Sequence, residues 1–433
     1  MDLIQDIVEE HLDEAAWLWA QRKHALLAPD HDMADTAEWE ERLLAHVDGL
    51  VEGGAPVAET LLYPTLKDTD PARVSAAALA LLNTPAPTKE LVRVLLSGAG
   101  LERAPAVQRA LELCEHEGLG ELLLPLLRLQ DAGLRAAALE VLVFREEAPD
   151  ALLAEFLLHE DVRIRIAALR GLRVIPRTGK LNLLSQSLAS PHPALQQAAI
   201  EVGLTLGLRE PWEACRQAMR ASKTPGREML VLWAMGGGEE DMNLLVELLR
   251  TPQHRADALW ALGFSGRVVA AEACLPWLED EKVARLAGEA FSAITGLRLE
   301  GGYVLPPEAL PEEPIPLEQE DLDADLSPRP EDNLPLPHPE TVTAWWRAER
   351  NRFTPGTRYL MGHPFHGEVL WVALARGPMR RRHAWALELA IRSRGACRVP
   401  TCALTRRQRG ALEQVRSTAV RLPMSPFARL LIG

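Results

Sequence analysis

The residues whose types could support metal chemistry are few and scattered. His363 and His366 stand three positions apart, and Cys397 and Cys402 flank four residues near the end of the chain. Zinc sites use Cys and His, but they normally combine two closely spaced pairs. Neither segment has such a second pair, so we expect no metal site and no cofactor.

Catalytic motifs are equally sparse. Glu38, Glu40 and Glu41 are close enough in sequence for general acid–base chemistry, but a run of acids is more typical of a solvated helix face. The sequence contains no Walker loop, no Gly-x-Ser-x-Gly elbow and no His-Glu-x-x-His motif. The three glycines at 236–238 indicate the end of a helix rather than a phosphate-binding loop. We therefore expect a binding protein and not an enzyme.

A repeating pattern of small and apolar residues predicts the fold. Val74, Ala77, Ala78 and Leu81 lie at helical spacing, and similar sets begin at positions 107, 134, 164, 195, 228, 255 and 284. The starts are 33, 27, 30, 31, 33, 27 and 29 residues apart. Self-similarity at this period is typical of stacked helical pairs. We predict an all-α, HEAT-like solenoid of about eight helical pairs.

Charged residues at fixed places in the repeats fit this architecture. An Asp at a helix start accepts hydrogen bonds from free backbone N–H groups, and an Arg further on can pair with an acid of the adjacent repeat. The aspartates are Asp70, Asp131, Asp161 and Asp280, and the arginines four or five residues later are Arg135, Arg165 and Arg285. Before the repeats, Thr36 is the expected cap of a helix in the acidic N-terminal region.

Charge divides the chain into regions of opposite sign. The formal net charge is −14, with 29 basic and 45 acidic residues in 1–299, 1 and 12 in 300–340, and 17 and 4 in 341–433. We predict an acidic helical cap (1–57), the solenoid (58–297), an acidic proline-rich linker or strap (298–340) and an Arg-rich helical segment (341–433). An acidic body repels nucleic acid and attracts basic proteins.

The Arg-rich segment has two possible roles. We expect helices at 367–375 and 378–393, and the second begins with Arg380, Arg381 and Arg382. These arginines could bind phosphate groups. They could equally pair with the acidic linker, which we favour because both lie on one chain at high effective concentration.

The sequence also bears on location. It has no apolar run of 18 residues, and its acidic N-terminus lacks the basic region of a secretory signal. Five cysteines are too few and too scattered for a disulfide framework. We expect a cytoplasmic protein with no membrane contact.

Three blocks of the chain resemble a proteobacterial family. They are residues 285–296 (RLAGEAFSAITG), 358–362 (RYLMG) and 380–389 (RRRHAWALEL). Members of this family are similar to HEAT-repeat proteins, and their genes tend to lie beside type VI secretion genes. The resemblance covers nearly the whole chain. It implies an immunity or accessory protein for a secreted toxin, and it supplies no catalytic residues.

Three functions follow as hypotheses. The first is an immunity protein that neutralises a type VI antibacterial effector, a nuclease (DNase) toxin, by covering its basic surface. The second is an adaptor or scaffold that loads an effector onto the secretion system. The third is a HEAT-like DNA glycosylase, which would need a basic groove, whereas residues 1–299 are acidic.

We expect the partner to be a protein with a basic surface, with no direct nucleic-acid contact. Candidate contacts are two acidic clusters and the tryptophans, because buried aromatics dominate interface energetics. The first cluster is Asp30, Asp32, Asp35, Glu38, Glu40 and Glu41; the second is Glu318, Glu320, Asp321, Asp323 and Asp325. The tryptophans are Trp345 and Trp346, with Trp17 and Trp19 as further anchors.

Overall fold

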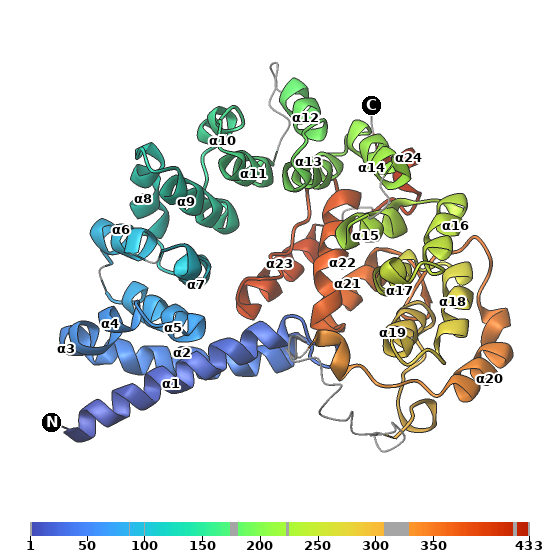
Figure 1. Cartoon of the computed structure of the whole chain (residues 1–433), viewed down its shortest axis with the longest axis horizontal. Helices are drawn as coiled ribbons and strands as arrows, with labels where there is room; N and C mark the ends of the chain where they lie inside the picture. The colour runs from blue at the N-terminus through green and yellow to red at the C-terminus, as the bar shows by residue number, and fades with distance from the viewer. Residues whose placement is uncertain are drawn as a thin grey trace, which may run out of the picture.

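In the part of the chain that the structure describes, eight helical pairs follow one another and form an arch (Figure 1). The computed structural model describes residues 2–85, 87–98, 100–173, 181–221, 225–306, 329–418 and 422–431. The first helices of the pairs lie on the outside of the arch, and the second helices lie on the inside (Figure 1).

The first helices are α3 (Gly54–Val57) continued by η1 (Ala58–Leu62) and α4 (Tyr63–Thr65), α6 (Lys89–Gly98), α8 (Leu119–Leu123) with η2 (Leu124–Arg128), α10 (Asp150–Phe156), α12 (Leu181–Leu188), α14 (Glu210–Ala221), α16 (Glu239–Leu248), and α18 (Val268–Cys274) with η3 (Leu275–Trp277). The second helices are α5 (Pro71–Leu82), α7 (Gly100–Leu113), α9 (Ala132–Arg145), α11 (Val162–Gly171), α13 (Pro193–Thr205), α15 (Arg227–Gly236), α17 (Pro252–Ser265) and α19 (Ala284–Thr295).

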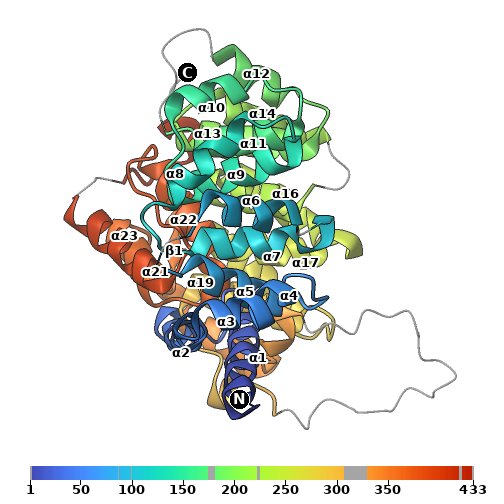
Figure 2. The same cartoon turned by 90° about the vertical axis from the view of Figure 1, so that its left-hand side faces the viewer.

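Small residues on the second helices allow the pairs to stack. Ala77 and Ala78 of α5 are fully buried, as are Ala198 and Ala199 of α13. Short side chains at these positions let neighbouring helices approach closely. α5 packs on α7, α9 on α11, α15 on α17, and α17 on α19. Figure 2 shows the repeats rising in one row from α3 to α12. The predicted all-α solenoid is confirmed.

Two long helices precede the repeats. α1 (Asp2–Ala25) and α2 (Met33–Glu52) pack on each other, and α1 also packs on α5. α2 begins at Met33, and its cap is Asp32, whose carboxylate accepts from the Ala34 and Asp35 N–H groups. The expectation that Thr36 caps this helix is wrong, because Thr36 lies in the first turn and its hydroxyl donates to the Asp32 carbonyl (2.8 Å).

Three of the four repeat aspartates cap helices, as predicted. Asp70 and Asp131 accept from backbone N–H groups at the starts of α5 and α9, and Asp161 does so at the start of α11. The expectation is wrong for Asp280, because α19 begins at Ala284 and the Asp280 carboxylate binds the Lys282 N–H and Arg255 before the helix starts.

The expected arginine pairing with acids is wrong in two places. Arg135 donates to the Leu129 carbonyl, and Arg285 donates to the Leu334 carbonyl. These two arginines bind backbone carbonyls of loops and do not form ion pairs between repeats.

The chain after the repeats turns back into the arch. Its described elements are η4 (Gly301–Tyr303), η7 (Pro330–Asn333), α20 (Pro339–Glu349), η8 (Arg350–Arg352), β1 (Tyr359–Leu360), β2 (His363–Pro364), α21 (Gly367–Arg376), α22 (Met379–Arg392), α23 (Thr405–Ser417) and α24 (Phe427–Leu430). α22 packs on α13, and α23 packs on α2 (Figure 1). One hydrophobic cluster extends from Leu12 to Leu431, so this C-terminal segment shares the core of the repeats.

A short antiparallel hairpin fixes the C-terminal segment to the last repeats. The Tyr359 N–H donates to the Gly266 carbonyl (2.7 Å), and the Met361 N–H donates to the Ala293 carbonyl (2.8 Å). Gly266 ends α17 with φ +66°, and the Tyr359 backbone lies where a Cβ would stand. A glycine is therefore needed there. Among the described residues, no helix combines the length and the apolarity that a bilayer crossing requires.

Candidate functional site

The first predicted acidic cluster is divided by the structure. Asp30, Asp35, Glu38 and Glu41 are exposed, whereas Asp32 is half-buried as the α2 cap. Glu40, the remaining member, is 3% exposed and lies under the surface. The prediction that Glu40 contacts a partner is therefore wrong, because its buried carboxylate cannot reach another protein.

The second predicted cluster belongs to the linker between η4 and η7. Glu318, Glu320, Asp321, Asp323 and Asp325 lie outside the described residues. Within the described part of the linker, Glu331 is bound internally, where it accepts from Arg380 (3.0 Å) and Arg227 (3.2 Å).

The tryptophans differ sharply in exposure. Trp346 is 5% exposed and packs on Phe291 and Phe353, with ring centroids 5.5 and 5.2 Å apart, and half-buried Trp345 also contacts Phe291. Trp346 is thus a core residue, which corrects its assignment as an interface anchor. Trp19 is buried as well.

Trp17 is the exposed member of this set, at 46%. It meets Trp39 edge to face at 5.6 Å, and the Arg42 guanidinium lies over both rings. Glu38 and Glu41 lie on either side of Trp39 in the sequence of α2 and are exposed. We call Trp17, Trp39, Arg42, Glu38 and Glu41 the α1–α2 face.

Arg358 and Arg392 of the C-terminal segment point inward to one carboxylate. Glu388 is 1% exposed and accepts from Arg358 Nη2 (2.9 Å) and Arg392 Nε (2.7 Å). Burial raises the pKa of the Glu388 carboxyl, but the two guanidinium groups outweigh it and hold the pKa below its usual range. This group is a buried internal ion cluster.

The three arginines at the start of α22 are also buried. Arg380 lies 3.4 Å and Arg381 3.5 Å from the Glu289 carboxylate, and Arg380 also binds Glu331. Arg382 donates to the Leu374 carbonyl and the Gln408 side chain, both at 2.6 Å. Burial lowers the pKa of Arg381 and of Arg382 to about 10.

The expected pairing with the linker is confirmed for Arg380, which binds Glu331, and is not found for Arg381 or Arg382 within the described residues. Glu331 is the described linker acid that binds this triplet, and the other contacts come from α19 and from the C-terminal segment itself. The arginines are therefore packing elements of the interior. Their sequence positions gave no sign of this, because their partners are distant along the chain.

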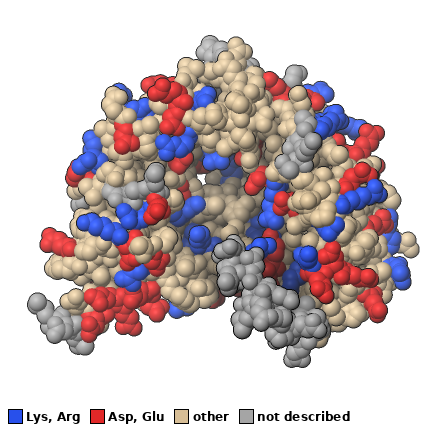
Figure 3. All heavy atoms as spheres, viewed as in Figure 1, with Lys and Arg blue, Asp and Glu red and all other residues tan. Residues whose placement is uncertain are grey.

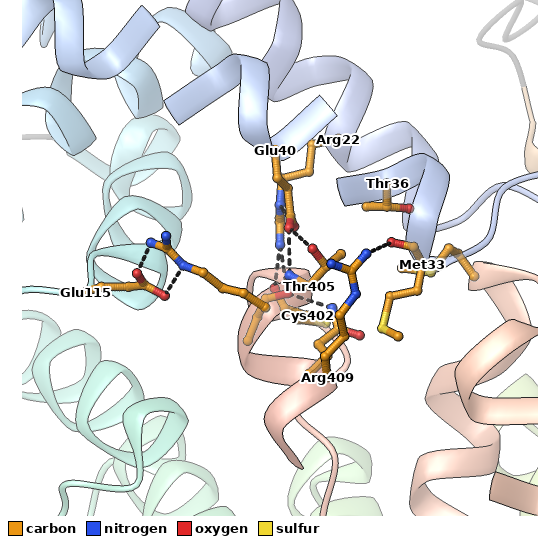
Figure 4. A network of polar contacts seen from close by, with 12 residues as sticks. Arg22, Met33, Thr36, Glu40, Glu115, Cys402, Thr405 and Arg409 are labelled. Carbon is orange, nitrogen blue, oxygen red and sulfur yellow. Dashed lines mark hydrogen bonds and ion pairs between the residues drawn. The ribbon is translucent and has the colours of Figure 1, made fainter. Parts of the chain in front are cut away.

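A polar network joins the two ends of the chain (Figure 4). Arg22 Nε donates to Glu40 Oε1 (2.8 Å), and Arg22 Nη2 donates to the Cys402 carbonyl (3.0 Å). The other Glu40 oxygen accepts from the Thr405 backbone N–H and hydroxyl, both at 2.6 Å. Glu40, near the N-terminus of the chain, thereby caps α23, near its C-terminus. Burial lowers the pKa of Arg22 although Glu40 opposes the shift.

A second contact of α23 reaches the middle of the solenoid. Arg406 pairs with Glu115, which follows α7, and Arg407 Nη2 donates to the Arg145 carbonyl (3.2 Å). Together with the Glu40 network, these bonds hold α23 across the opening of the arch. The space-filling view shows a hollow beside this crossing with basic side chains on its walls (Figure 3).

The cysteine and histidine candidates form no cluster of metal ligands. His363 and His366 are exposed, Cys397 is buried, and the described residues contain no group of three His, Cys, Asp or Glu suited to a metal. Cys402 Sγ lies 4.0 Å from His383 Nδ1. Burial raises the pKa of the Cys402 thiol, but His383, Arg109 and Arg22 outweigh it and leave the pKa lowered.

Comparison with known proteins adds little. No family model and no curated protein matches the chain. Among solved structures, an engineered protein from the Northeast Structural Genomics Consortium is similar at 18% identity over 64% of this chain and 87% of its own, with a TM-score of 0.28. So distant a likeness carries no functional argument.

Proposed function

We propose that this protein is a cytoplasmic immunity protein that binds and neutralises an antibacterial type VI effector, with a nuclease (DNase) as the toxin. The observation that carries the proposal is the separation of charge in the molecule. Four arginines of the C-terminal segment, Arg380, Arg381, Arg382 and Arg392, are buried, whereas acids of α1 and α2 are exposed. The type of toxin and the secretion context rest on the family resemblance given above.

Exposed acids gather on the N-terminal helix pair. Figure 3 shows them over the start of the chain at the lower left. They are Asp6, Glu9, Glu10, Asp13, Asp35, Glu38, Glu41, Asp48 and Glu52. A surface of this kind attracts a basic protein and speeds its association, and it repels nucleic acid. At this face it favours a basic protein partner over nucleic acid.

The α1–α2 face supplies a suitable anchor. Exposed Trp17, supported by Trp39 and Arg42, combines aromatic area with a charged rim. Interfaces commonly concentrate their binding energy in such aromatic and arginine groups. We propose that a basic patch of the toxin covers this face.

The test is binding to the effector encoded beside the gene. We expect the association rate constant to fall at least tenfold between about 50 and 500 mM salt, because exposed charges are screened. Glu38→Lys with Glu41→Lys should slow association, and Trp17→Ala should cost about 2 kcal/mol of binding free energy. Glu279→Lys with Glu281→Lys is the matched control, since these exposed acids lie beyond α18.

Two results would contradict the proposed interface. Equal association rates at both salt concentrations would remove its electrostatic basis. An equal effect of the two double variants would show that overall charge matters and the α1–α2 face does not. Binding without protection of cells would favour the adaptor function.

A further inference from the structure

A pocket of about 350 Å³ lies between the solenoid and the C-terminal segment. Its walls come from residues just beyond the ends of α9 and α11, from the loop between α22 and α23, and from one side of α23. Its charged lining residues, within the described part of the chain, are Glu146, Arg173, Arg398 and Arg407. Polar groups that converge on a pocket of this size are typical of a site for a small molecule.

Each of the three arginines keeps at least one donor for a ligand. Arg407 donates through Nη2 to the Arg145 carbonyl (3.2 Å), and Arg398 reaches two main-chain carbonyls through Nε and Nη2, both at the long distance of 3.4 Å. Arg173 donates through Nη1 and Nη2. No described residue accepts from Arg173 Nε, Arg398 Nη1 or Arg407 Nη1, and none of these three atoms is buried.

Positive charge is in excess at this pocket. Glu146 lies 3.3 Å from Arg173 and is the acid among the described lining residues. Burial lowers the pKa of Arg398 to about 10, the charge of Arg173 adds to this shift, and Glu146 opposes it. Three guanidinium groups therefore face one carboxylate.

The charges around the pocket do not cancel this excess. Arg394 and the exposed Glu413 add one charge of each sign. Other neighbouring arginines already have acids of their own. These are Arg109 with Glu112, Arg145 with Glu147, Arg406 with Glu115, Arg416 with Glu368, and Arg170 near Glu140 and Glu201. Within the described residues, the pocket therefore has two more cations than anions.

We propose that this pocket binds the phosphate monoester group of a small organic molecule. A phosphate monoester carries close to two negative charges at neutral pH, which matches the excess of two cations. Guanidinium groups donate strong, charge-assisted hydrogen bonds to phosphate oxygens. The body of the molecule lies against the apolar wall that Pro400, Ala411 and Val415 provide.

Three probes of similar shape test the head group by isothermal titration calorimetry on the full chain. They are phenyl phosphate, phenyl sulfate and phenol, which carry two, one and no negative charges at about pH 8. We expect phenyl phosphate to bind at least about tenfold more tightly than phenyl sulfate, and phenol not to bind. No binding of phenyl phosphate, or equal binding of phenyl phosphate and phenyl sulfate, overturns the proposal.

A fourth probe separates this pocket from a general polyanion surface. It is an oligothymidylate without a terminal phosphate, which offers phosphodiesters but no monoester. We expect it to bind more weakly than phenyl phosphate. Equal or tighter binding would overturn the proposal in favour of a nucleic-acid surface.

An arginine variant locates the site. Arg407→Gln removes one lining cation and should weaken phenyl phosphate binding at least about tenfold. Arg409→Gln is the matched control, because Arg409 also lies on α23 and donates to one main-chain carbonyl (Met33, 3.5 Å) but does not line the pocket. Equal effects of the two substitutions would show that only the total charge matters, which overturns the proposal.

A second variant tests the pocket without removing an internal bond. Gln414 is exposed, lines the pocket and lies on α23. Gln414→Glu adds a negative charge at nearly constant size and should weaken phenyl phosphate binding at least about fivefold, with unchanged circular dichroism. Gln253→Glu, at an exposed position of α17 outside the pocket, should leave binding unchanged. Unchanged binding in folded Gln414→Glu overturns the proposal.

Discussion

At the residue scale, the molecule keeps several charges out of water and pairs them closely. Glu388 binds Arg358 and Arg392, and Glu40 binds Arg22 and Thr405. Removing one member of such a group leaves the other charge buried without a counterion. These residues therefore have structural roles, whereas their exposed neighbours remain available for binding.

Glu388 provides the clearest test of the internal ion cluster. Glu388→Ala leaves Arg392, itself 2% exposed, without its carboxylate, and should lower the free energy of unfolding by about 3–5 kcal/mol. Glu413→Ala removes an exposed acid of α23 and should change it by less than about 0.5 kcal/mol. Urea unfolding measures both. Equal effects of the two substitutions would refute the structural role of Glu388.

Glu201 on α13 predicts a pH dependence of folding stability. Its pKa is raised, whereas the pKa of Glu388 is lowered. Burial raises the pKa of the Glu201 carboxyl, although the bond from Gln197 Nε2 (2.9 Å) and the charge of Arg170 oppose the shift. The folded state then binds the proton more tightly than the unfolded chain. The carboxyl therefore reduces stability as pH rises through the raised pKa, and this cost remains at neutral pH.

Glu201→Gln removes that cost. We expect this variant to unfold at a higher urea concentration than the parent at pH 7, and the difference to shrink as pH falls toward the ordinary carboxyl pKa of 4.5. Glu121→Gln, at an exposed position of α8, is the control and should show no such trend. A difference for Glu201→Gln that grows on acidification would contradict the assigned sign.

At the element scale, local signals predicted the repeats well. Aspartate caps such as Asp70 and Asp131 depend on neighbours two or three residues away, so the sequence pattern was sufficient. The cap of α2 was predicted at Thr36, whereas the structure has it at Asp32. Both are good capping residues, and they stand four positions apart. The capping of α23 by Glu40 could not be foreseen, because the two residues are 365 positions apart.

Glu40 should decide whether α23 stays attached to α2. Glu40→Ala leaves Arg22 buried without its carboxylate and removes both bonds to Thr405. We expect faster hydrogen exchange in α1, α2 and α23, and no change in α17 and α19, because local openings report local contacts. Glu41→Ala, at the adjacent exposed position, should leave exchange unchanged. Faster exchange throughout the molecule, or unchanged exchange in α1, α2 and α23, would contradict the role of Glu40 in holding α23 on α2.

At the scale of the whole molecule, the solenoid is not an empty arch. Its C-terminal segment occupies part of the inner side, from α13 to α2, and shares one core with the repeats (Figure 1). The sequence showed a basic segment and an acidic body, but it could not show that Arg380, Arg381 and Arg392 are buried. That outcome depends on partners such as Glu289 and Glu388, which tertiary packing brings together. The α1–α2 face combines exposed acids with the exposed Trp17.

Survival of cells that produce the neighbouring effector tests the proposed function most directly. The effector is expressed in the cytoplasm of a susceptible strain with the parent protein, with the Glu38→Lys, Glu41→Lys variant, or with the Glu279→Lys, Glu281→Lys control. We predict that the parent and the control restore growth, and that the α1–α2 variant restores it at least tenfold less. Death of cells that contain the folded parent protein would contradict the immunity function.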